Sequence, residues 1–204
     1  MPLLIAFLLL GISFLPIANA TTPTIQLPDE SVTMTVYDGA SAYFDIDLAD
    51  IPTDLDVENG YYHGWCADRS VTMPRGEQLT IKLYSSYDPA LPTKLQKDHW
   101  DKVNYILNHN NGASKNDLQD AFWYLLCNYP YSALSSTAQL LVDTAQDDFI
   151  PQAGDWIAIP AQPIYNESNP WPIQIAFLQV LLPSQEQPDD EPITAPKRIS
   201  HGLH

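Results

Sequence analysis

The period of the apolar residues changes twice along the chain, and this restricts the folds that the chain can adopt. Alternating apolar and polar positions, typical of β-strands, occur in four early segments: residues 32–37, 42–48, 60–68 and 78–85. Asp38-Gly39 follows the first of these segments and is typical of a hairpin turn. Strand character returns late in the chain, at residues 155–159 and 173–182.

Between the two groups of strands, apolar residues recur at spacings of three and four, which predicts α-helices. A first helix is predicted to begin at Asp98. Ser114 opens a second helix, with Asp117 three residues on in a variant of the capping box. Ser135 or Ser136 caps a third. The order of strands, helices and strands predicts an α+β domain, whose antiparallel sheet is sandwich-like or barrel-like and carries an inserted segment of about three helices.

Charge and composition exclude several classes of protein. The chain has 204 residues, of which 25 are acidic and 9 are basic, and its formal net charge is −16. Such a chain repels phosphate backbones, so we expect no binding to nucleic acid. Aromatic residues make up 11% of the chain, which is enough to build a core and excludes wholesale disorder. A total of 18 prolines against 8 glycines favours strand ends and turns over a long helical bundle.

The first residues of the chain have the pattern of a secretory signal peptide. Residues 3–17 are nearly all apolar, and Ala18-Asn19-Ala20 follows as a small-x-small cleavage site. The pattern predicts export with cleavage before Thr21, a secreted or extracellular-surface location, and no membrane span after cleavage. The predicted parts of the chain are the signal peptide (residues 1–20), an N-terminal linker (21–30), a folded domain (31–183) and an acidic, Pro-rich, disordered tail (184–204).

The chain has two cysteines, Cys66 in the third predicted strand and Cys127 near the end of the second predicted helix. In an exported protein, two cysteines most simply form one disulfide. That bond would close a loop of about 60 residues and stabilise the fold by roughly 4 kcal/mol. On this interpretation the chain is a non-catalytic secreted binding or structural module.

A glutamine on the second helix offers Cys66 another partner. Gln119 shares a helix face with Phe122, Trp123 and Leu126, at spacings of three, four and seven. One interpretation is that Gln119 is simply a solvated polar residue beside these apolar ones. However, Trp65-Cys66-Ala67-Asp68 on a strand and Gln119-Asp120-Ala121-Phe122-Trp123 on a later helix together resemble the thioester domains of bacterial surface adhesins. The shared pattern is an aromatic residue before a cysteine, with Gln-x-Ala-(Ile/Phe)-Trp on the helix.

The resemblance implies an intramolecular thioester between the sulfur of Cys66 and the side-chain acyl carbon of Gln119, formed with loss of ammonia. A thiolate is the nucleophile in this chemistry, and a primary carboxamide is the acyl donor. An amine, such as a Lys side chain of a partner, would then attack, leaving an isopeptide bond and freeing Cys66. The reaction happens once per molecule, so the resemblance implies a covalent binder of an amine-bearing protein or surface ligand and not a turnover enzyme.

Three aromatic residues accompany the proposed pair: Trp65, Phe122 and Trp123. They are expected to be core residues that also exclude water from the bond. Trp65 stands where the family commonly has Tyr, and Phe122 where it commonly has Ile. Both keep the apolar bulk, so neither change removes a reacting group.

Two polar residues flank Cys66. Asp68 is expected on the same strand face, where its carboxylate would raise the pKa of the Cys66 thiol. His63 is three residues away along the strand and points to the other face. A surface or hydrogen-bonding role for His63 is therefore favoured over a proton relay.

Other chemistries find less support. A papain-like protease needs its cysteine at the start of a helix, and the chain has no such signature. A cysteine-dependent acyl transferase that turns over is a third interpretation, after the covalent binder and the disulfide-bonded module. The histidines are scattered, and the acidic residues Asp45, Asp47, Asp50, Asp54 and Asp56 follow no calcium-loop pattern, so we interpret them as solvated surface. We therefore expect no metal and no cofactor, and the sequence does not indicate an oligomeric state.

Overall fold

The computed structural model of the chain describes residues 22–164 and 172–184, which form six strands, three α-helices and two short 3-10 helices. The strands are β1 (Val32–Asp38), β2 (Phe44–Ala49), β3 (Gly60–Cys66), β4 (Gln78–Leu83), β5 (Trp156–Pro163) and β6 (Ala176–Leu181). The helices are α1 (Trp100–Asn108), α2 (Lys115–Cys127) and α3 (Ser136–Thr144), with 3-10 helices at Thr93–Leu95 and Tyr131–Ala133. Each predicted strand and helix is present, and β5 runs on past its predicted end at residue 159.

The six strands of the described chain close into a barrel in the order β1-β2-β3-β6-β5-β4, and every neighbouring pair is antiparallel. The predicted α+β class with an antiparallel sheet is confirmed. Of the two predicted forms of the sheet, sandwich and barrel, the structure has the barrel. β1 and β4 close it, with Val32 opposite Ile81. Each described strand therefore has a neighbour on both sides, and the sheet closes on itself.

Alternation along the strands fills the barrel interior with apolar side chains. β2 alternates buried and half-buried residues along its whole length, and its buried residues point inward. Gly64 of β3 lies beside Ile46, and a Cβ at Gly64 would come within 2.3 Å of the Ile46 Cδ1 atom. Gly64, two residues before Cys66, has no side chain and therefore leaves room for Ile46 in the barrel interior. This interior cluster, the barrel core, includes Met34, Phe44, Ile46, Cys66, Ile81, Ile159 and Leu178.

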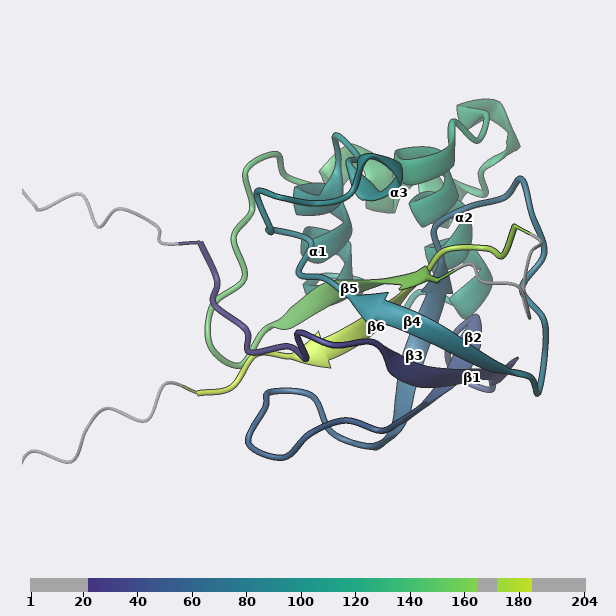
Figure 1. Cartoon of the computed structure of the whole chain (residues 1–204). Coiled ribbons are helices and arrows are strands. Elements are labelled where there is room, and N and C mark those ends of the chain that lie inside the picture. Colours follow the sequence, from purple (N-terminus) through teal and green to yellow (C-terminus); the bar gives the residue numbers. More distant parts are fainter. Residues whose placement is uncertain (1–21, 165–171, 185–204) are drawn as a thin grey trace, which may run out of the picture.

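All three described α-helices lie in the chain between β4 and β5 and gather on one side of the barrel (Figure 1). Trp65 of β3 and Phe177 of β6 point out of the barrel on that side and are buried by the helices. Phe122 of α2 contacts both, with ring centroids 5.1 Å from Trp65 and 5.2 Å from Phe177. The molecule thus has a second cluster between helices and barrel, the helical core, which includes Trp65, Trp100, Ile106, Phe122, Leu141 and Phe177.

Local capping explains where the helices begin and end. The Ser114 hydroxyl accepts the Asp117 N–H at 3.2 Å, which confirms the predicted start of α2. α2 ends at Cys127 and is capped by Asn128, whose φ of 54° lies in the left-handed region that asparagine tolerates. Ser135 caps α3 by accepting the Ala138 N–H at 3.1 Å. Of the two candidate caps for the third helix, the structure therefore uses Ser135.

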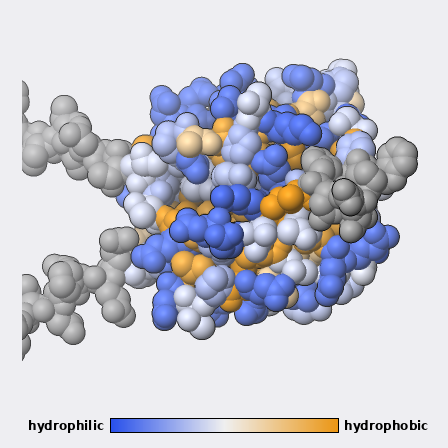
Figure 2. All heavy atoms as spheres, in the orientation of Figure 1, coloured by the Kyte–Doolittle hydropathy of each residue, from blue (hydrophilic) through white to orange (hydrophobic). Residues whose placement is uncertain are grey.

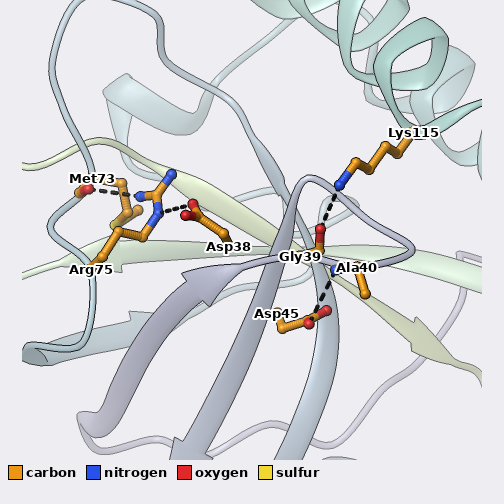
Figure 3. Close-up of polar contacts among 7 residues, drawn as sticks. All are labelled: Asp38, Gly39, Ala40, Asp45, Met73, Arg75 and Lys115. Carbon is orange, nitrogen blue, oxygen red and sulfur yellow. Dashed lines mark hydrogen bonds and ion pairs between the residues drawn. The ribbon is translucent and has the colours of Figure 1, made fainter.

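The β1–β2 hairpin is held to α2 and to the loop before β4 (Figure 3). Lys115 at the start of α2 donates to the Gly39 carbonyl at 2.6 Å, and Arg75 donates to the Asp38 carboxylate at 2.9 Å. A Cβ at Gly39 would lie 2.3 Å from the Ala42 carbonyl oxygen, so the tight hairpin requires glycine there. The hairpin therefore has a defined position relative to the helix that carries Gln119.

The described part of the predicted N-terminal linker packs on the barrel. Ile25 and Leu27 lie against the barrel core, and the Gln26 carbonyl accepts the Asp56 N–H at 3.0 Å. Its alternating apolar residues explain why this segment is not a free linker. The predicted signal peptide and all but the first residue of the predicted tail lie outside the described residues.

Hydrophilic residues cover much of the face shown in Figure 2, with smaller apolar patches between them. In the described ranges, no helix is both long enough and apolar enough to cross a membrane.

Candidate functional site

Cys66 and Gln119 meet where the two cores join. Cys66 is the last residue of β3, and Gln119 lies in the second turn of α2. Neighbouring side chains bring the strand and helix together, because Trp65 and Phe122 pack edge to face in the helical core. Cys66 itself belongs to the barrel core. The packing of α2 against the end of β3 therefore places the predicted pair in contact.

The carboxamide of Gln119 forms two reciprocal hydrogen bonds with the backbone of Cys66. The Cys66 N–H donates to Oε1 at 2.8 Å, and Nε2 donates to the Cys66 carbonyl at 2.9 Å. Both residues are almost fully buried, with 0% of Cys66 and 1% of Gln119 exposed. The carboxamide is thereby fixed against the residue that carries the thiol. A donor on its carbonyl oxygen also polarises the acyl group.

The Cys66 sulfur has two hydrogen-bond partners. Its S–H donates to the Asp68 carbonyl at 3.0 Å, and the indole N–H of Trp123 donates to Sγ at 3.1 Å. Burial raises the pKa of the Cys66 thiol, while the Trp123 hydrogen bond and the Asp68 backbone act in the opposite direction. The buried sulfur is thus held as a thiol, with a donor already aimed at it.

Aromatic and cationic groups surround Trp123 at this point. The Tyr43 ring meets its indole edge to face, with centroids 5.4 Å apart. The Arg69 guanidinium lies 4.9 Å from the Trp123 ring and 4.2 Å from the Tyr129 ring. Arg69 and Tyr129 therefore hold the indole from one side, and Tyr43 contacts it from the hairpin.

Trp65, the other tryptophan at the site, has a different environment. Only 2% of it is exposed, and its ring packs on Phe122 in the helical core. Among the described residues, no group accepts a hydrogen bond from its buried indole N–H. Trp65 is thus a packing residue at the site, whereas Trp123 reaches the sulfur.

The two polar residues flanking Cys66 are placed differently from each other. Asp68 follows the end of β3 and contacts the thiol through its backbone carbonyl, and its carboxylate accepts from the N–H and hydroxyl of Ser70. The expected same-face strand position of the Asp68 side chain is therefore not observed, because the strand ends at Cys66. His63 is exposed on the strand face opposite Cys66, so the structure does not bring its ring to the pair.

Several residues of the site were not identified in the sequence. Tyr43 lies in a segment predicted only as a strand, and Arg69 and Tyr129 carry no motif of their own, so only the fold brings the three to Trp123. Gln174 is a second buried glutamine close to the site, and its Nε2 donates to the carbonyls of Asp68 and Val71. It stabilises the loop that receives the Cys66 S–H. An isolated glutamine before an apolar strand carries no signal for this role.

Both cysteines of the chain lie in its described part, and both are free thiols. The structure therefore does not contain the disulfide of the alternative interpretation. Cys127 is partly buried at the end of α2, and burial, together with the Cys66 sulfur, raises the pKa of its thiol to about 11. Cys127 is thus a weakly acidic thiol beside the site.

Carboxylates of the acidic cluster formed by Asp45, Asp47, Asp50, Asp54 and Asp56 accept local hydrogen bonds. Asp45 accepts the Ala40 N–H, and Asp50 accepts the Thr33 hydroxyl. In residues 22–164 and 172–184, no group of three or more His, Cys, Asp and Glu side chains could hold a metal ion.

Comparisons with known proteins give a likeness in fold. No family model and no curated protein matches the chain. The fold is similar to a solved N-terminal thioester domain of a surface protein from Clostridium perfringens, at 11% identity and a TM-score of 0.42, over 72% of this chain and 97% of that one. A variant of that domain with a cysteine replaced by alanine gives 11% identity and a TM-score of 0.44, over 74% and 99% of the two chains. At this identity and TM-score the likeness does not assign the chain to a family.

Proposed function

We propose that Cys66 and Gln119 form an intramolecular thioester, and that the chain uses it to bind covalently to an amine of a partner. The observation that carries the proposal is the buried, reciprocal pair of hydrogen bonds between the Gln119 carboxamide and the Cys66 backbone. A glutamine bound in this way is positioned as an acyl donor next to a thiol. The motifs Trp65-Cys66 and Gln119-Asp120-Ala121-Phe122-Trp123 support the same chemistry.

Formation of the bond joins the Cys66 sulfur to the Gln119 acyl carbon and breaks the carbon–nitrogen bond of the carboxamide. The thiol proton leaves with the nitrogen, which departs as ammonia. The Cys66 N–H already donates to Oε1, so it would stabilise the negative charge that this oxygen carries in the tetrahedral intermediate. Because the reacting groups are held by the fold, no second molecule is needed.

Capture of a partner reverses the role of the sulfur. An amine attacks the acyl carbon, the carbon–sulfur bond breaks, and Cys66 leaves as a thiolate that takes up a proton. The product is an amide between Gln119 and the partner, and the bond is used once. Burial of the pair by the helical core limits competing hydrolysis before the partner arrives.

The partner in this proposal is an amine-bearing protein or surface ligand outside the cell. The signal-peptide pattern at residues 1–20 supports export to a secreted or surface location. The net charge of −16 would attract a Lys-rich surface, which supplies the attacking amine.

Intact mass spectrometry tests the proposal. The thioester form is lighter than the unmodified chain by one ammonia, whereas a Cys66–Cys127 disulfide removes only two hydrogens. Methylamine should then add to residue 119, as peptide mapping would locate, and expose a new thiol at Cys66. The matched control is Gln174→Ala, which removes the second buried glutamine of the described residues, bound to the Asp68 carbonyl, and should still show ammonia loss. An unmodified mass in the folded protein, or methylamine incorporation that persists in Cys66→Ala, would contradict the proposal.

A further inference from the structure

The two tryptophans at the site differ in what their indole N–H groups contact. The Trp123 N–H donates to the Cys66 sulfur at 3.1 Å, whereas the Trp65 N–H has no acceptor among the described residues. A neutral thiol is a weak acceptor, but a thiolate accepts a hydrogen bond strongly. A donor aimed at this sulfur therefore has its largest effect when the sulfur carries negative charge.

The fold holds Trp123 in this position from several sides. It follows Gln119 by four residues on α2, so one helix face carries both the carboxamide and the indole. Tyr43 contacts the indole from the β1–β2 hairpin, which Lys115 of the same helix binds at its turn (Figure 3). Arg69, in the loop after β3, lies over the Trp123 ring. This arrangement fixes the direction of the N–H as well as the place of the ring.

We propose that Trp123 is a catalytic residue of the site, whose indole N–H stabilises negative charge on the Cys66 sulfur when the thioester forms and when an amine breaks it. This inference rests on the proposed function. Arg69 is a positioning residue that acts through the Trp123 ring. The role goes beyond the water exclusion expected of an aromatic cover.

No proton moves from the indole in either step. During formation the sulfur attacks the Gln119 acyl carbon, and its proton passes to the leaving nitrogen, which departs as ammonia. During capture the amine nitrogen bonds to that carbon, the sulfur leaves with the electron pair of the carbon–sulfur bond, and the proton that the amine loses ends on the sulfur. In both steps the sulfur carries more negative charge at the transition state than in the neutral thiol or the thioester, and the Trp123 N–H already lies in place to stabilise it.

The groups around the sulfur make such a donor valuable. Burial disfavours a thiolate at Cys66 and raises the pKa of its thiol, and the Asp68 carboxylate adds to this effect. The Trp123 hydrogen bond, the Asp68 backbone and the Arg69 charge oppose it. The Trp123 hydrogen bond is the largest of the influences that lower this pKa, and it is made by a side chain directly to the Cys66 sulfur.

Kinetics of the two tryptophan variants test the proposal. Trp123→Phe keeps an aromatic ring and removes the donor, and Trp65→Phe is the matched control because its N–H has no acceptor. Capture of methylamine by the preformed thioester should slow by about tenfold in Trp123→Phe, the factor expected for loss of one hydrogen bond to a developing charge. Trp65→Phe, which removes an indole N–H without an acceptor in the described part of the chain, should slow the reaction much less. A Trp123→Phe protein that reacts faster would show that the ring is only a cover, and an equal slowing in both variants would also overturn the proposal.

A second measurement does not depend on the thioester. In a Gln119→Ala, Cys127→Ser background the only thiol is Cys66, and the pH dependence of its alkylation by iodoacetamide gives its pKa. Trp123→Phe should raise this pKa by about one unit, and Trp65→Phe should leave it unchanged. Arg69→Gln, which keeps both indoles, should raise it by less. If the unchanged protein shows no ammonia loss but these pKa shifts appear, the proposed function fails and the donor role stands. If the pKa does not move in Trp123→Phe, the donor role fails.

Discussion

At two contacts between helices and barrel, a carboxamide on the helix makes a reciprocal pair of hydrogen bonds with the backbone of a strand residue, and only one of these strand residues is a cysteine. Where α1 meets β5, the Asn108 carboxamide donates to the Trp156 carbonyl at 2.8 Å and accepts the Trp156 N–H at 2.7 Å. Where α2 meets β3, Gln119 makes the same reciprocal pair with Cys66. In both cases a helix side chain takes the place of a neighbouring strand. Reciprocal pairing by itself is therefore a way to attach a helix to the barrel.

The two contacts differ in residue type and in water access. Trp156 is 38% exposed at the start of β5, while Cys66 and Gln119 are buried. The α1 contact also has a second carboxamide, since Asn104 accepts the Ala158 N–H at 2.7 Å and donates to the Trp100 carbonyl and the Ser86 hydroxyl. The two contacts therefore share the pairing and differ in two conditions that the proposed thioester needs, which are a thiol on the strand and exclusion of water.

The largest effect on stability is expected for Asn104→Ala. It removes three hydrogen bonds of a buried side chain and leaves the Ala158 N–H without its acceptor. The free energy of unfolding should fall by about 3 kcal/mol. Urea denaturation measures this loss, and intact mass should still show ammonia loss in the folded fraction. Stable folding without ammonia loss would mean that the two contacts are not independent.

Gln119→Ala should have a smaller effect on stability and a complete effect on chemistry. The variant loses two buried hydrogen bonds, and the free energy of unfolding should fall by about 2 kcal/mol relative to a thioester-free Cys66→Ala reference. Ammonia loss should disappear entirely. If instead Gln119→Ala remains lighter by one ammonia, another carboxamide supplies the acyl group and Gln174 becomes the candidate.

Trp156→Cys tests whether burial is needed. In a Cys66→Ala, Cys127→Ser background it places the only thiol beside the reciprocal pair at Asn108. The loss of a partly exposed indole should cost about 1 kcal/mol of unfolding free energy. We expect no lasting mass deficit of one ammonia, because water would reach an exposed thioester and hydrolyse it to a carboxylic acid at residue 108 and a free thiol. A persistent ammonia loss there would show that burial is not a condition for the bond.

The smallest effect concerns pH and the start of α2. Hydrogen bonds from the hydroxyls of Ser114 and Ser135 lower the pKa of Asp117 below its ordinary value of 3.8. A lowered pKa in the folded state stabilises the protein above the unfolded value, and this stability is lost as the pH falls through the folded value. Asp117→Asn should therefore reduce stability at neutral pH and flatten its decline below about pH 4. Thermal melting between neutral and acidic pH measures both slopes, and parallel curves would contradict the assignment.

Much of the fold could be predicted from local patterns. The alternation in β2 and the helical spacing in α1 identified their elements, and Ser114 marked the start of α2 correctly. These signals depend on contacts between residues a few positions apart, so they are present in the sequence itself. The paired motifs around Cys66 and Gln119 also named both members of the pair. The choice between sandwich and barrel could not be predicted, because it depends on β1 meeting β4 across the sheet.

The amino-acid sequence by itself determined the order of strands and helices and the presence of a cysteine and a glutamine of the right chemistry. Only the tertiary structure decided that the Gln119 carboxamide binds the Cys66 backbone, 53 residues away. It also decided that Trp123, and not Trp65, gives its N–H to the sulfur, and that Asp68 contacts the thiol through its carbonyl. The physical reason is that periodicity and capping act over a few residues, whereas these contacts arise only when the helical core packs α2 against the end of β3.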